Sequence, residues 1–265
     1  MMDCPHPRQF GAVNWLGLWT LYAREVRRFL KIFMQTVLAP VVTTHVFLAI
    51  FALALGRSVQ MIGDVPFIEF LAPGLVMMAM AQNAFANTSS SIMLGKIQGS
   101  IVDVLMPPLS SFELGLGYVA GGVTRGLLVG FATFLAIRLF VPVGIHSVFF
   151  ILYHGIAASM MLALLGVIGG IWSEKFDHIA AVTNFVVTPL AFLSGTFYTI
   201  DRLPENWQFI AHLNPFFYMI DGFRYGFIGQ TDGTLTIGLI VMAGVNLGLW
   251  ALVLRMLATG YKLKP

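Results

Sequence analysis

The sequence predicts an all-α integral membrane protein with six transmembrane helices. Of its 265 residues, 58% are hydrophobic and 10% are charged, whereas a soluble domain carries about 25% charged residues. Uncharged runs of about eighteen residues or more are long enough to cross the ~30 Å hydrocarbon layer as helices. Because these runs do not alternate polar and apolar residues, they predict helices and not the strands of a barrel.

The predicted spans divide the chain into three parts. Residues 1–31 form a cytoplasmic N-terminus, 32–258 a single membrane domain, and 259–265 a cytoplasmic tail. The spans are expected at about 32–55, 70–94, 112–140, 148–172, 180–200 and 235–258. No short apolar core followed by a cleavage site opens the chain, so no removable signal peptide is predicted.

The cations are distributed unequally between the two sides of the predicted membrane. On one side, the segments that flank the spans carry ten cations: Arg8, Arg24, Arg27, Arg28, Lys31, Lys96, Lys175, Arg255, Lys262 and Lys264. On the other side, they carry four: Arg57, Arg138, Arg202 and Arg224. By the positive-inside rule this places both termini in the cytoplasm. This distribution accounts for the net charge of +3 without a nucleic-acid-binding patch. Separately, the chain has a single cysteine, Cys4, which excludes an internal disulfide.

Residues Trp15–Lys31 predict an amphipathic helix ahead of the first span. One stripe contains Trp15, Trp19, Tyr22, Val26 and Phe29, and the other face contains Arg24, Glu25, Arg27, Arg28 and Lys31. Such a helix lies in the plane of the headgroups, with its aromatic side chains inward and its cations toward anionic lipid. A plain juxtamembrane anchor and an elbow helix that also touches a cytoplasmic partner are both compatible with this pattern.

The second predicted span ends in polar residues, namely Gln82, Asn83, Asn87, Thr88, Ser89, Ser90 and Ser91. In lipid these side chains are costly unless they face other helices or water. These residues either form hydrogen bonds between helices or line a translocation path, and the sequence alone leaves both roles open.

The stretch GSIVDVLMPPLSS (Gly99–Ser111) predicts a short cytoplasmic helix at the end of that span. On a helix from Ile97 to Leu105, one stripe holds Ile97, Ile101, Val104 and Leu105, and the other holds Gln98, Ser100 and Asp103. Gly99 and the pair Pro107–Pro108 mark breaks, because proline cannot continue a helix. The segment is too short to span a bilayer. It is expected either to dock into a groove of a cytoplasmic protein or to rest on lipid.

The third span is rich in glycine and carries an arginine. Gly117 and Gly121, and likewise Gly122, Gly126 and Gly130, are spaced four residues apart, which predicts close packing of helices. Arg125 lies among these glycines, and a guanidinium at membrane depth must face protein or water. Structural anchoring and a role in the path are both open for Arg125.

Two short pieces on either side of Asn214–Pro215 separate the last two spans. Neither is long enough to cross the membrane. The second piece, Phe216 to Ile228, carries Asp221 and Arg224 three residues apart, so the two are expected to pair on one helical face. The segment predicts either two re-entrant helices covered by protein or an amphipathic cap on the outer surface.

Motifs of nucleotide hydrolysis and of membrane-enzyme chemistry are absent from the sequence. There is no GxxxxGK[ST] phosphate loop, no HExxH, no GxSxG and no Cys/His cluster. Regularly placed carboxylates at span centres, which ion-coupled carriers commonly need, are also missing. A secondary carrier or channel is the main competing function, and an enzyme that acts on lipid is a more distant one.

From about residue 15 to its end, the chain resembles the membrane-spanning permease subunits of ABC exporters of the type-2 branch. The resemblance rests on FLAPGL at Phe70–Leu75, on GSIVDVLMPPLSSFEL at Gly99–Leu114 before a glycine-rich span with Arg125, and on HLNPFFYMIDGFRYGFIG at His212–Gly229. The order of an amphipathic elbow, six spans and a broken outer segment also agrees. The family includes bacterial drug, polysaccharide and lipo-oligosaccharide exporters.

The resemblance implies a non-catalytic subunit of the bacterial inner membrane. This chain would pair with its own copy or a close paralogue, and two cytoplasmic ATPase subunits would bind ATP and Mg. No cofactor is expected on this chain. The cargo is expected to be a drug, a lipid-like molecule or a glycolipid, with a polysaccharide as the alternative.

The resemblance also implies roles for particular residues. The coupling helix would be Gln98–Leu105, with Gln98, Ile101, Asp103, Val104 and Leu105, and the elbow helix would include Trp15, Trp19, Tyr22, Arg24 and Arg28. The re-entrant outer segment would contain Pro215, Asp221 and Arg224. The candidate path residues on spans two and five are Asn83, Asn87, Thr183, Asn184, Thr188, Phe197 and Tyr198.

Overall fold

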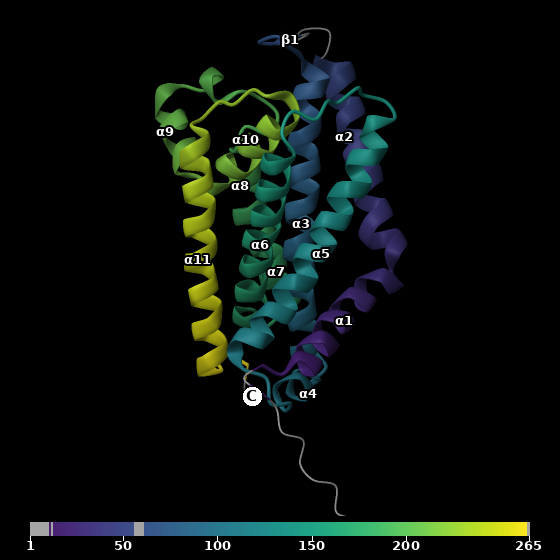
Figure 1. Ribbon diagram of the computed structural model, residues 1–265, viewed down its shortest axis with the longest axis vertical. Coiled ribbons are helices and arrows are strands. Elements are labelled where there is room, and N and C mark those ends of the chain that lie inside the picture. The colour runs from purple at the N-terminus through teal and green to yellow at the C-terminus, as the bar shows by residue number, and fades with distance from the viewer. Residues whose placement is uncertain (1–10, 12, 56–60, 264–265) are drawn as a thin grey trace, which may run out of the picture.

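The protein is a bundle of long helices that run between two ends, which we call the lower and upper ends as they appear in Figure 1. The computed structural model describes residues 11, 13–55 and 61–263. Cys4 and the predicted flanking cations Arg8, Arg57 and Lys264 lie outside the described residues. Helix α1 (Trp15–Lys31) begins at the lower end, where α4 (Ile101–Leu105) also lies.

Five helices among the described residues are long and apolar enough to cross a membrane. They cover Met34–Ala54, Phe67–Ile97, Ser111–Arg138, Val148–Trp172 and Leu235–Thr259. In the element order these are η1 (Met34–Leu38) with α2 (Ala39–Leu55), then α3, α5, α6 and α11. The bounds of the fourth predicted span, 148–172, are confirmed, as is a helix over Trp15–Lys31.

The predicted fifth span, 180–200, is wrong in its bounds. The helical segment consists of α7 (Phe176–Val182), η2 (Thr183–Val187) and α8 (Thr188–Phe192), and it therefore stops at Phe192. The chain turns at Gly195, whose φ of 75° is accessible mainly to glycine. The hydroxyl of Thr196 donates to the carbonyl of Ala191 and closes this turn. The apolar run continues past the turn, so hydropathy alone misplaced the end of the helix.

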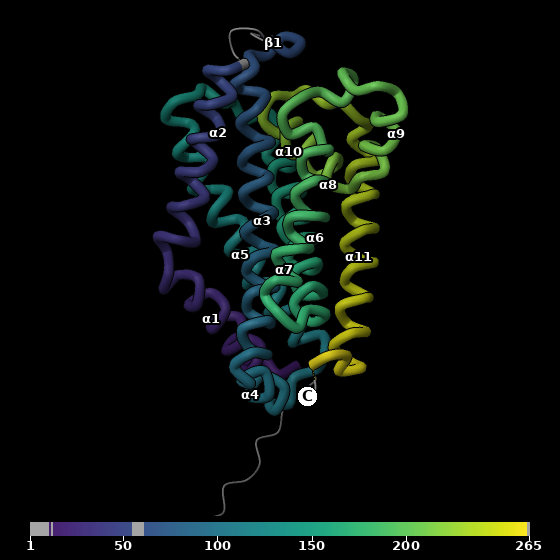
Figure 2. The backbone as a smooth tube through the Cα atoms, turned by 180° about the vertical axis from the view of Figure 1, so that it is seen from behind, coloured from purple at the N-terminus to yellow at the C-terminus, as the bar shows by residue number. Residues whose placement is uncertain are grey.

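Helix α3 occupies the centre of the bundle, where it packs against α2, α5, α6 and α10 (Pro215–Ile228). Its side chains Leu71, Met77, Ala84 and Met93 are fully buried. The front and back views both show α3 between α2 and α5 on one side and α6 on the other (Figures 1 and 2). Helix α3 therefore contacts most of the other long helices.

The glycines of α5 allow close contacts with helices on two sides, as their spacing predicts. A Cβ on Gly117 would meet Leu21 of α1 at 2.6 Å, and one on Gly121 would meet Glu25 at 2.6 Å. On the other side, a Cβ on Gly122 would meet Thr88 of α3 at 2.8 Å. Alpha-helices approach this closely only where side chains are absent.

Two π-helical turns interrupt the bundle at equivalent positions before prolines. In η1 the N–H of Ala39 bonds to the carbonyl of Met34, and in η2 the N–H of Thr188 bonds to that of Thr183. Pro40 lies two residues after the end of η1, and Pro189 lies two residues after the end of η2. Because proline lacks an N–H and clashes with the preceding turn, the wider turn accommodates it without breaking the helix.

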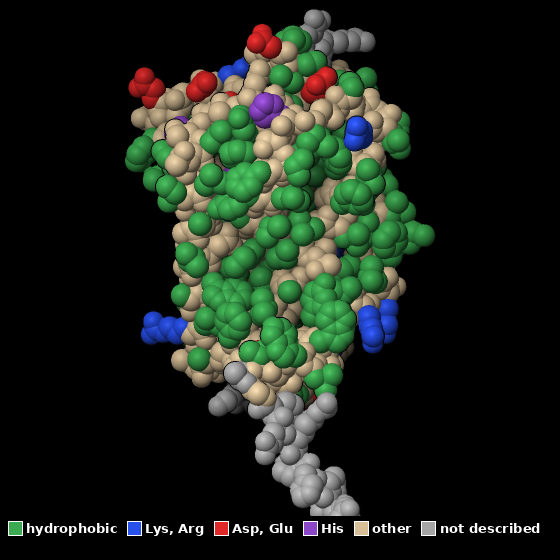
Figure 3. Space-filling model, in the orientation of Figure 1, with side chains coloured by type: hydrophobic (Ala, Val, Ile, Leu, Met, Phe, Trp, Pro, Cys, Tyr) green, Lys and Arg blue, Asp and Glu red, His purple; other side chains and the backbone are tan. Residues whose placement is uncertain are grey.

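The upper end is closed by short elements. A two-residue hairpin pairs β1 (Met61–Ile62) with β2 (Val65–Pro66), and η3 (Ile200–Arg202), α9 (Glu205–Leu213) and α10 follow α8. Figure 3 shows hydrophobic side chains over the middle of one face, carboxylates at the upper end, and Lys or Arg side chains toward both ends. This banding is typical of a protein surrounded by lipid.

Candidate functional site

The lower end joins the starts of α1 and α5 through one buried carboxylate. Glu113 accepts the backbone N–H of Asn14 at 2.5 Å, and the N–H and hydroxyl of Ser110 at 2.6 and 2.8 Å. Ser110 and Glu113 thereby form a capping box at the start of α5. Asn14 caps α1 through the N–H of Gly17 and donates its amide to the carbonyl of Pro108.

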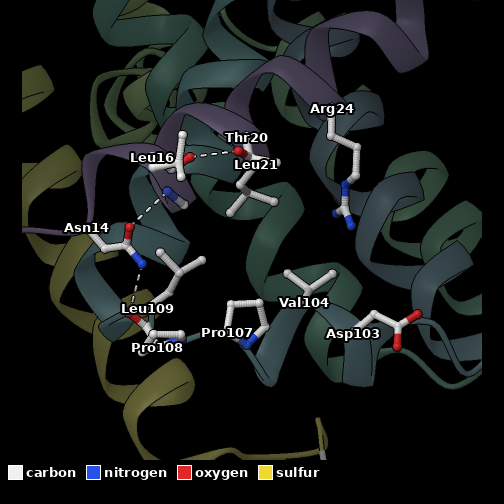
Figure 4. A pocket seen from close by; sticks show the side chains of 11 residues that line it. Asn14, Leu16, Thr20, Leu21, Arg24, Asp103, Val104, Pro107, Pro108 and Leu109 are labelled. Atoms are coloured by element: carbon white, nitrogen blue, oxygen red, sulfur yellow. Dashed lines mark hydrogen bonds between the residues drawn. The ribbon is translucent and has the colours of Figure 1, made fainter. Parts of the chain in front are cut away.

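A pocket of about 280 Å³ lies beside these contacts, between α1 and the α4–α5 connection. Figure 4 shows Leu16, Thr20 and Leu21 of α1 on one side, facing Val104, Pro107 and Leu109. A Cβ on Gly17 would lie 2.7 Å from Leu109. The chain after α4 is therefore packed directly against α1.

Helix α4 is shorter than predicted, and its apolar face is turned inward. The chain reverses at Gly99, whose φ is 71°, and the helix covers only Ile101–Leu105. Ile101 and Val104, predicted as contacts for a partner, are each only 7% exposed. The prediction of this contact face is therefore corrected, because the surface left free by the described chain is formed by Val102, Asp103 and Met106. Gln98 is exposed and Leu105 is half-buried.

A fully buried carboxylate ties α1 to α3. Glu25 accepts from Arg24 at 3.1 Å, from Arg28 at 3.2 Å and from the hydroxyl of Ser91 at 2.8 Å. Arg28 also donates to Asn87, both to its backbone carbonyl at 2.7 Å and to its side-chain oxygen at 3.1 Å. Glu25 does not lie on the outward face where the sequence pattern put it.

The aromatic residues of α1 take two different positions. Trp15 and Trp19 are 72% and 64% exposed, at the surface where lipid headgroups would lie. Tyr22 instead points to α5 and hydrogen-bonds Thr124 at 3.1 Å, and Phe29 is buried. The face of α1 that packs on the bundle is thus Leu21, Glu25 and Phe29.

Two adjoining cavities lie between α2, α3, α7 and α8, helices that can be followed in Figure 2. One, of about 440 Å³, is bounded by η1, α2, α3 and α8, and the other, of about 510 Å³, by α3, α7, η2 and α8. Gln82, Asn83 and Thr188 line both. We call the pair the α3–α8 groove. Amide and hydroxyl side chains line it together with apolar ones, and no carboxylate does so.

The groove brings together four of the seven candidate path residues, Asn83, Thr183, Asn184 and Thr188. Asn87 is fully buried behind the groove, where Arg28 holds it, and is not a lining residue. Phe197 and Tyr198 lie in the turn beyond α8. The Phe197 ring stacks on Phe51 at 4.6 Å and on Phe192 at 5.2 Å, at the upper end of the groove.

Arg125 finds its partner across the α3–α5 interface. Its guanidinium donates to the side-chain oxygen of Asn83 at 2.9 Å. The amide nitrogen of Asn83 donates to the carbonyl of Ala79 on its own helix, so the orientation of the side chain is set at both ends. A guanidinium at membrane depth thus fixes a residue that lines the groove.

At the upper end Arg224 is buried and joins several elements. It donates to the carbonyl of Gly195 at 2.7 Å, lies 3.8 Å from the ring centre of Phe70, and approaches Asp232 at 3.9 Å. Burial raises the pKa of Asp232, although Arg224 opposes this effect. The predicted pairing of Arg224 with Asp221 is wrong, because Asp221 instead accepts the Thr231 hydroxyl and the Asp232 N–H.

Helix α10 is mostly buried, whereas α9 is mostly exposed, with Ala211 as its buried residue. Pro215 opens α10 at its first position, after Asn214 has capped it. Most of α10 is buried, including Phe216, Phe223 and Phe227, and it packs on α6, α3 and α11. Its close neighbour on α6 is His154, whose ring a Cβ on Gly222 would strike.

Several site residues were not identified from the sequence. Glu113 and Asn14 were missed, although Ser110 and Glu113 fit the S/T-x-x-E capping pattern, which a search for helix starts would find. Glu25 was assigned to a solvated face because a carboxylate beside four cations resembles a charged surface. Among the described residues, no group of three or more His, Cys, Asp or Glu could hold a metal ion.

Comparison with known proteins places these features in context. The family described as ABC-2 type transporter matches residues 17–228. The inner membrane transport permease YadH of Escherichia coli K12 is 38% identical over 245 residues, which cover 91% of this chain and 96% of YadH. Nodulation protein J of Rhizobium leguminosarum bv. viciae is 24% identical over 83% of this chain and 84% of its own length. Nodulation protein J of Neorhizobium galegae is 23% identical over 88% of each chain.

Proposed function

The chain belongs to the ABC-2 type transporter family, and on this premise we propose that it is the membrane-spanning permease subunit of an ATP-binding cassette exporter of the bacterial inner membrane. It pairs with its own copy or a close paralogue. Two separate cytoplasmic ATPase subunits bind ATP and Mg and drive the path between the two permease subunits. This chain is the non-catalytic part of the complex.

The observation that carries the proposal is the α3–α8 groove. It has polar walls at membrane depth, formed by Gln82, Asn83, Asn184 and Thr188. Polar side chains there are costly unless they serve a path or a partner. Its flanking helices each contain a π-helical turn, and such turns occur frequently at functional sites. Two grooves brought face to face by a two-fold axis form one enclosed path.

The shorter segment 176–192 serves as a sixth span. Helix α6 ends at the lower end and α11 starts at the upper end, so the chain must return between them (Figure 1). The segment Phe176–Phe192 is the apolar helix available for this crossing in that described part of the chain. A helix of seventeen residues rises about 25 Å, and local thinning of the bilayer accommodates the difference. Both termini then lie in the cytoplasm with α4.

Force reaches the groove through the lower end. A partner that moves α4 also moves α1 and α5, because Glu113 and Asn14 bind them together. Helix α1 is in turn bound to α3 through Glu25 and Arg28. Since α3 forms one wall of the groove, the motion of a cytoplasmic ATPase alters the path without a nucleotide site on this chain. At the upper end, α9 and α10 act as re-entrant helices that gate exit.

The mixed lining of the groove supports the proposed cargo. Apolar residues such as Leu75 and Met78 stand beside the amides and hydroxyls, which suits a drug, a lipid-like molecule or a glycolipid. A polysaccharide is the alternative. The stacked rings of Phe51, Phe192 and Phe197 at the upper end of the groove support it, because sugars bind to aromatic faces.

The proposal is tested by purification and reconstitution. A tagged chain is expressed in its native host, its bound proteins are identified, and proteoliposomes with and without the recovered ATPase are compared. We expect a nucleotide-binding subunit to copurify, and cargo to move only when that subunit and ATP are both present. Flux through the chain alone that collapses with an ion gradient would establish a secondary carrier instead.

A further inference from the structure

The largest cavity described in the protein lies at the lower end, between the C-terminal half of α1, the end of α3 and α4. Its volume is about 760 Å³. Four cationic side chains line it, those of Arg24, Arg27, Arg28 and Lys31, and no carboxylate is among the lining residues. This cavity is separate from the α3–α8 groove, with which it shares no lining residue.

The cations of the cavity are only partly neutralised. Glu25 lies behind the wall and contacts Arg24 and Arg28. The salt bridges formed within the described chain do not include Arg27 or Lys31, which are both exposed. One carboxylate therefore contacts two of the four cations, and an excess of positive charge remains in the cavity. Such a recess attracts an anionic group.

Apolar residues line the cavity at two places, on its membrane side and at α4, where Ile101 and Val104 lie. Ile32 and Leu94 line it and are exposed to the surroundings. Ile32 directly precedes the first span, and Leu94 is in the last turn of α3. The polar lining residues Gln98 and Ser100 lie toward α4. A ligand that fits this order is an amphiphile with a negative headgroup and an alkyl chain.

We infer that the cavity binds an anionic phospholipid of the surrounding bilayer. The phosphate lies among Arg27, Arg28 and Lys31, and an acyl chain runs along Ile32 and Leu94. A lipid fits better than an acidic protein surface, because the cations lie on the part of α1 that leads into the membrane, whereas a cytoplasmic partner would meet α4. The inference does not depend on the proposed exporter function.

The test measures lipid preference on the purified full-length chain. Native mass spectrometry compares the binding of phosphatidylglycerol and phosphatidylcholine with identical acyl chains. The test variant is Arg27→Gln with Lys31→Gln, and the matched control is Lys175→Gln with Arg255→Gln, two exposed cations outside the cavity. Because each cation near an anionic surface strengthens lipid attachment about fivefold, the test variant is expected to lose about thirtyfold of the preference for phosphatidylglycerol. The control is expected to keep it.

A second variant, Ser100→Trp, fills the cavity without changing its charge. It is expected to weaken phosphatidylglycerol binding, and a monodisperse elution profile verifies that each variant is folded. An unchanged lipid preference in the Arg27/Lys31 variant would overturn the inference. Displacement of phosphatidylglycerol by inorganic phosphate would identify a plain phosphate site, and displacement by the ATPase subunit would identify a protein interface. Either displacement also overturns the lipid assignment.

Discussion

The carboxylate of Glu113 accepts the backbone N–H of Asn14 across 99 positions of sequence, at 2.5 Å. The same carboxylate caps α5 through Ser110, while the Asn14 side chain caps α1 and reaches Pro108 after α4. Glu113 and Asn14 thereby link α1, the connection after α4 and α5. Under the proposed function, a partner that contacts α4 would act on these three elements together.

The first prediction concerns Glu113→Gln. The two oxygens of Glu113 accept the backbone N–H groups of Asn14 and Ser110, and a glutamine replaces one of these oxygens by an N–H₂ group, so one buried backbone N–H loses its acceptor. An unsatisfied buried donor costs about 1–3 kcal/mol, so the purified chain is expected to unfold at a lower temperature. If the proposed coupling holds, transport per ATP hydrolysed also falls, because α4 moves without α1. Glu174→Gln is the control, since Glu174 is an exposed carboxylate paired with Lys262 at the same end. If both variants lower the unfolding temperature and the transport per ATP equally, Glu113 has no specific part in coupling.

A second prediction tests the approach of α1 to α5. Gly121→Ala places a methyl group 2.6 Å from Cβ of Glu25, and overpacking of this kind destabilises a fold by about 1–3 kcal/mol. Gly248→Ala on α11 is the matched control, because nothing lies within 4 Å of its added Cβ. The control is expected to be neutral or stabilising. Stability is measured as the free energy of unfolding in mixed micelles, and a neutral Gly121→Ala would contradict the contact.

The sequence predicted most of the helices because their signals are local. Uninterrupted apolar runs located α6 to the residue, and the aromatic and cationic stripes located α1. Residues whose role depends on distant partners were misjudged. Glu25 was placed outward and Ile101 and Val104 were placed at a partner surface, because a helical stripe shows which residues share a face but not which neighbour covers it.

The end of the fifth span and the partner of Arg224 were wrong for a related reason. The turn at Gly195 is stabilised by the Thr196 hydroxyl and by the guanidinium of Arg224, which comes from 29 residues further along the chain. Periodicity within one segment carries no information about such contacts. Asn83 and Thr188, two of the candidate path residues, line the groove, and the sequence pointed to them because amides and hydroxyls in an apolar helix stand out locally. Their role in a path stays a prediction.

The third prediction measures the Arg125–Asn83 hydrogen bond by a double-mutant cycle. Arg125→Leu and Asn83→Leu each remove one partner of the 2.9 Å contact, and the double variant removes both. The coupling energy is expected at about 0.6–1.7 kcal/mol, the range of hydrogen bonds between membrane helices. Additive effects would mean that Arg125 is held by something other than Asn83. The measurement is unfolding in mixed micelles, as for Gly121→Ala.

The fourth prediction separates the exposed surface of α4 from its buried side. Met106 is 77% exposed, whereas Val104 is 7% exposed. Met106→Asp is expected to weaken recovery of the copurified ATPase while leaving the thermal stability of the chain unchanged. Val104→Asp is expected to lower the thermal stability of the chain, because it buries a carboxylate without a partner. If Met106→Asp retains the ATPase fully, the partner does not contact this face.

The final prediction locates the interface between two copies of the chain. Phe185 stands on the π-helical turn beside the groove and is 82% exposed, and Leu247 on α11 is 70% exposed. In a Cys4→Ser background, Phe185→Cys is expected to cross-link between copies in native membranes, and Leu247→Cys, equally accessible, is expected to cross-link far less. The reason is that a path between two copies requires the groove faces to meet, which brings both copies of position 185 close to the two-fold axis. Cross-linking is read as the dimer fraction on denaturing gels. A stronger signal from Leu247→Cys would place the interface at α11. The α3–α8 groove would then face lipid, where its amide and hydroxyl side chains are energetically unfavourable.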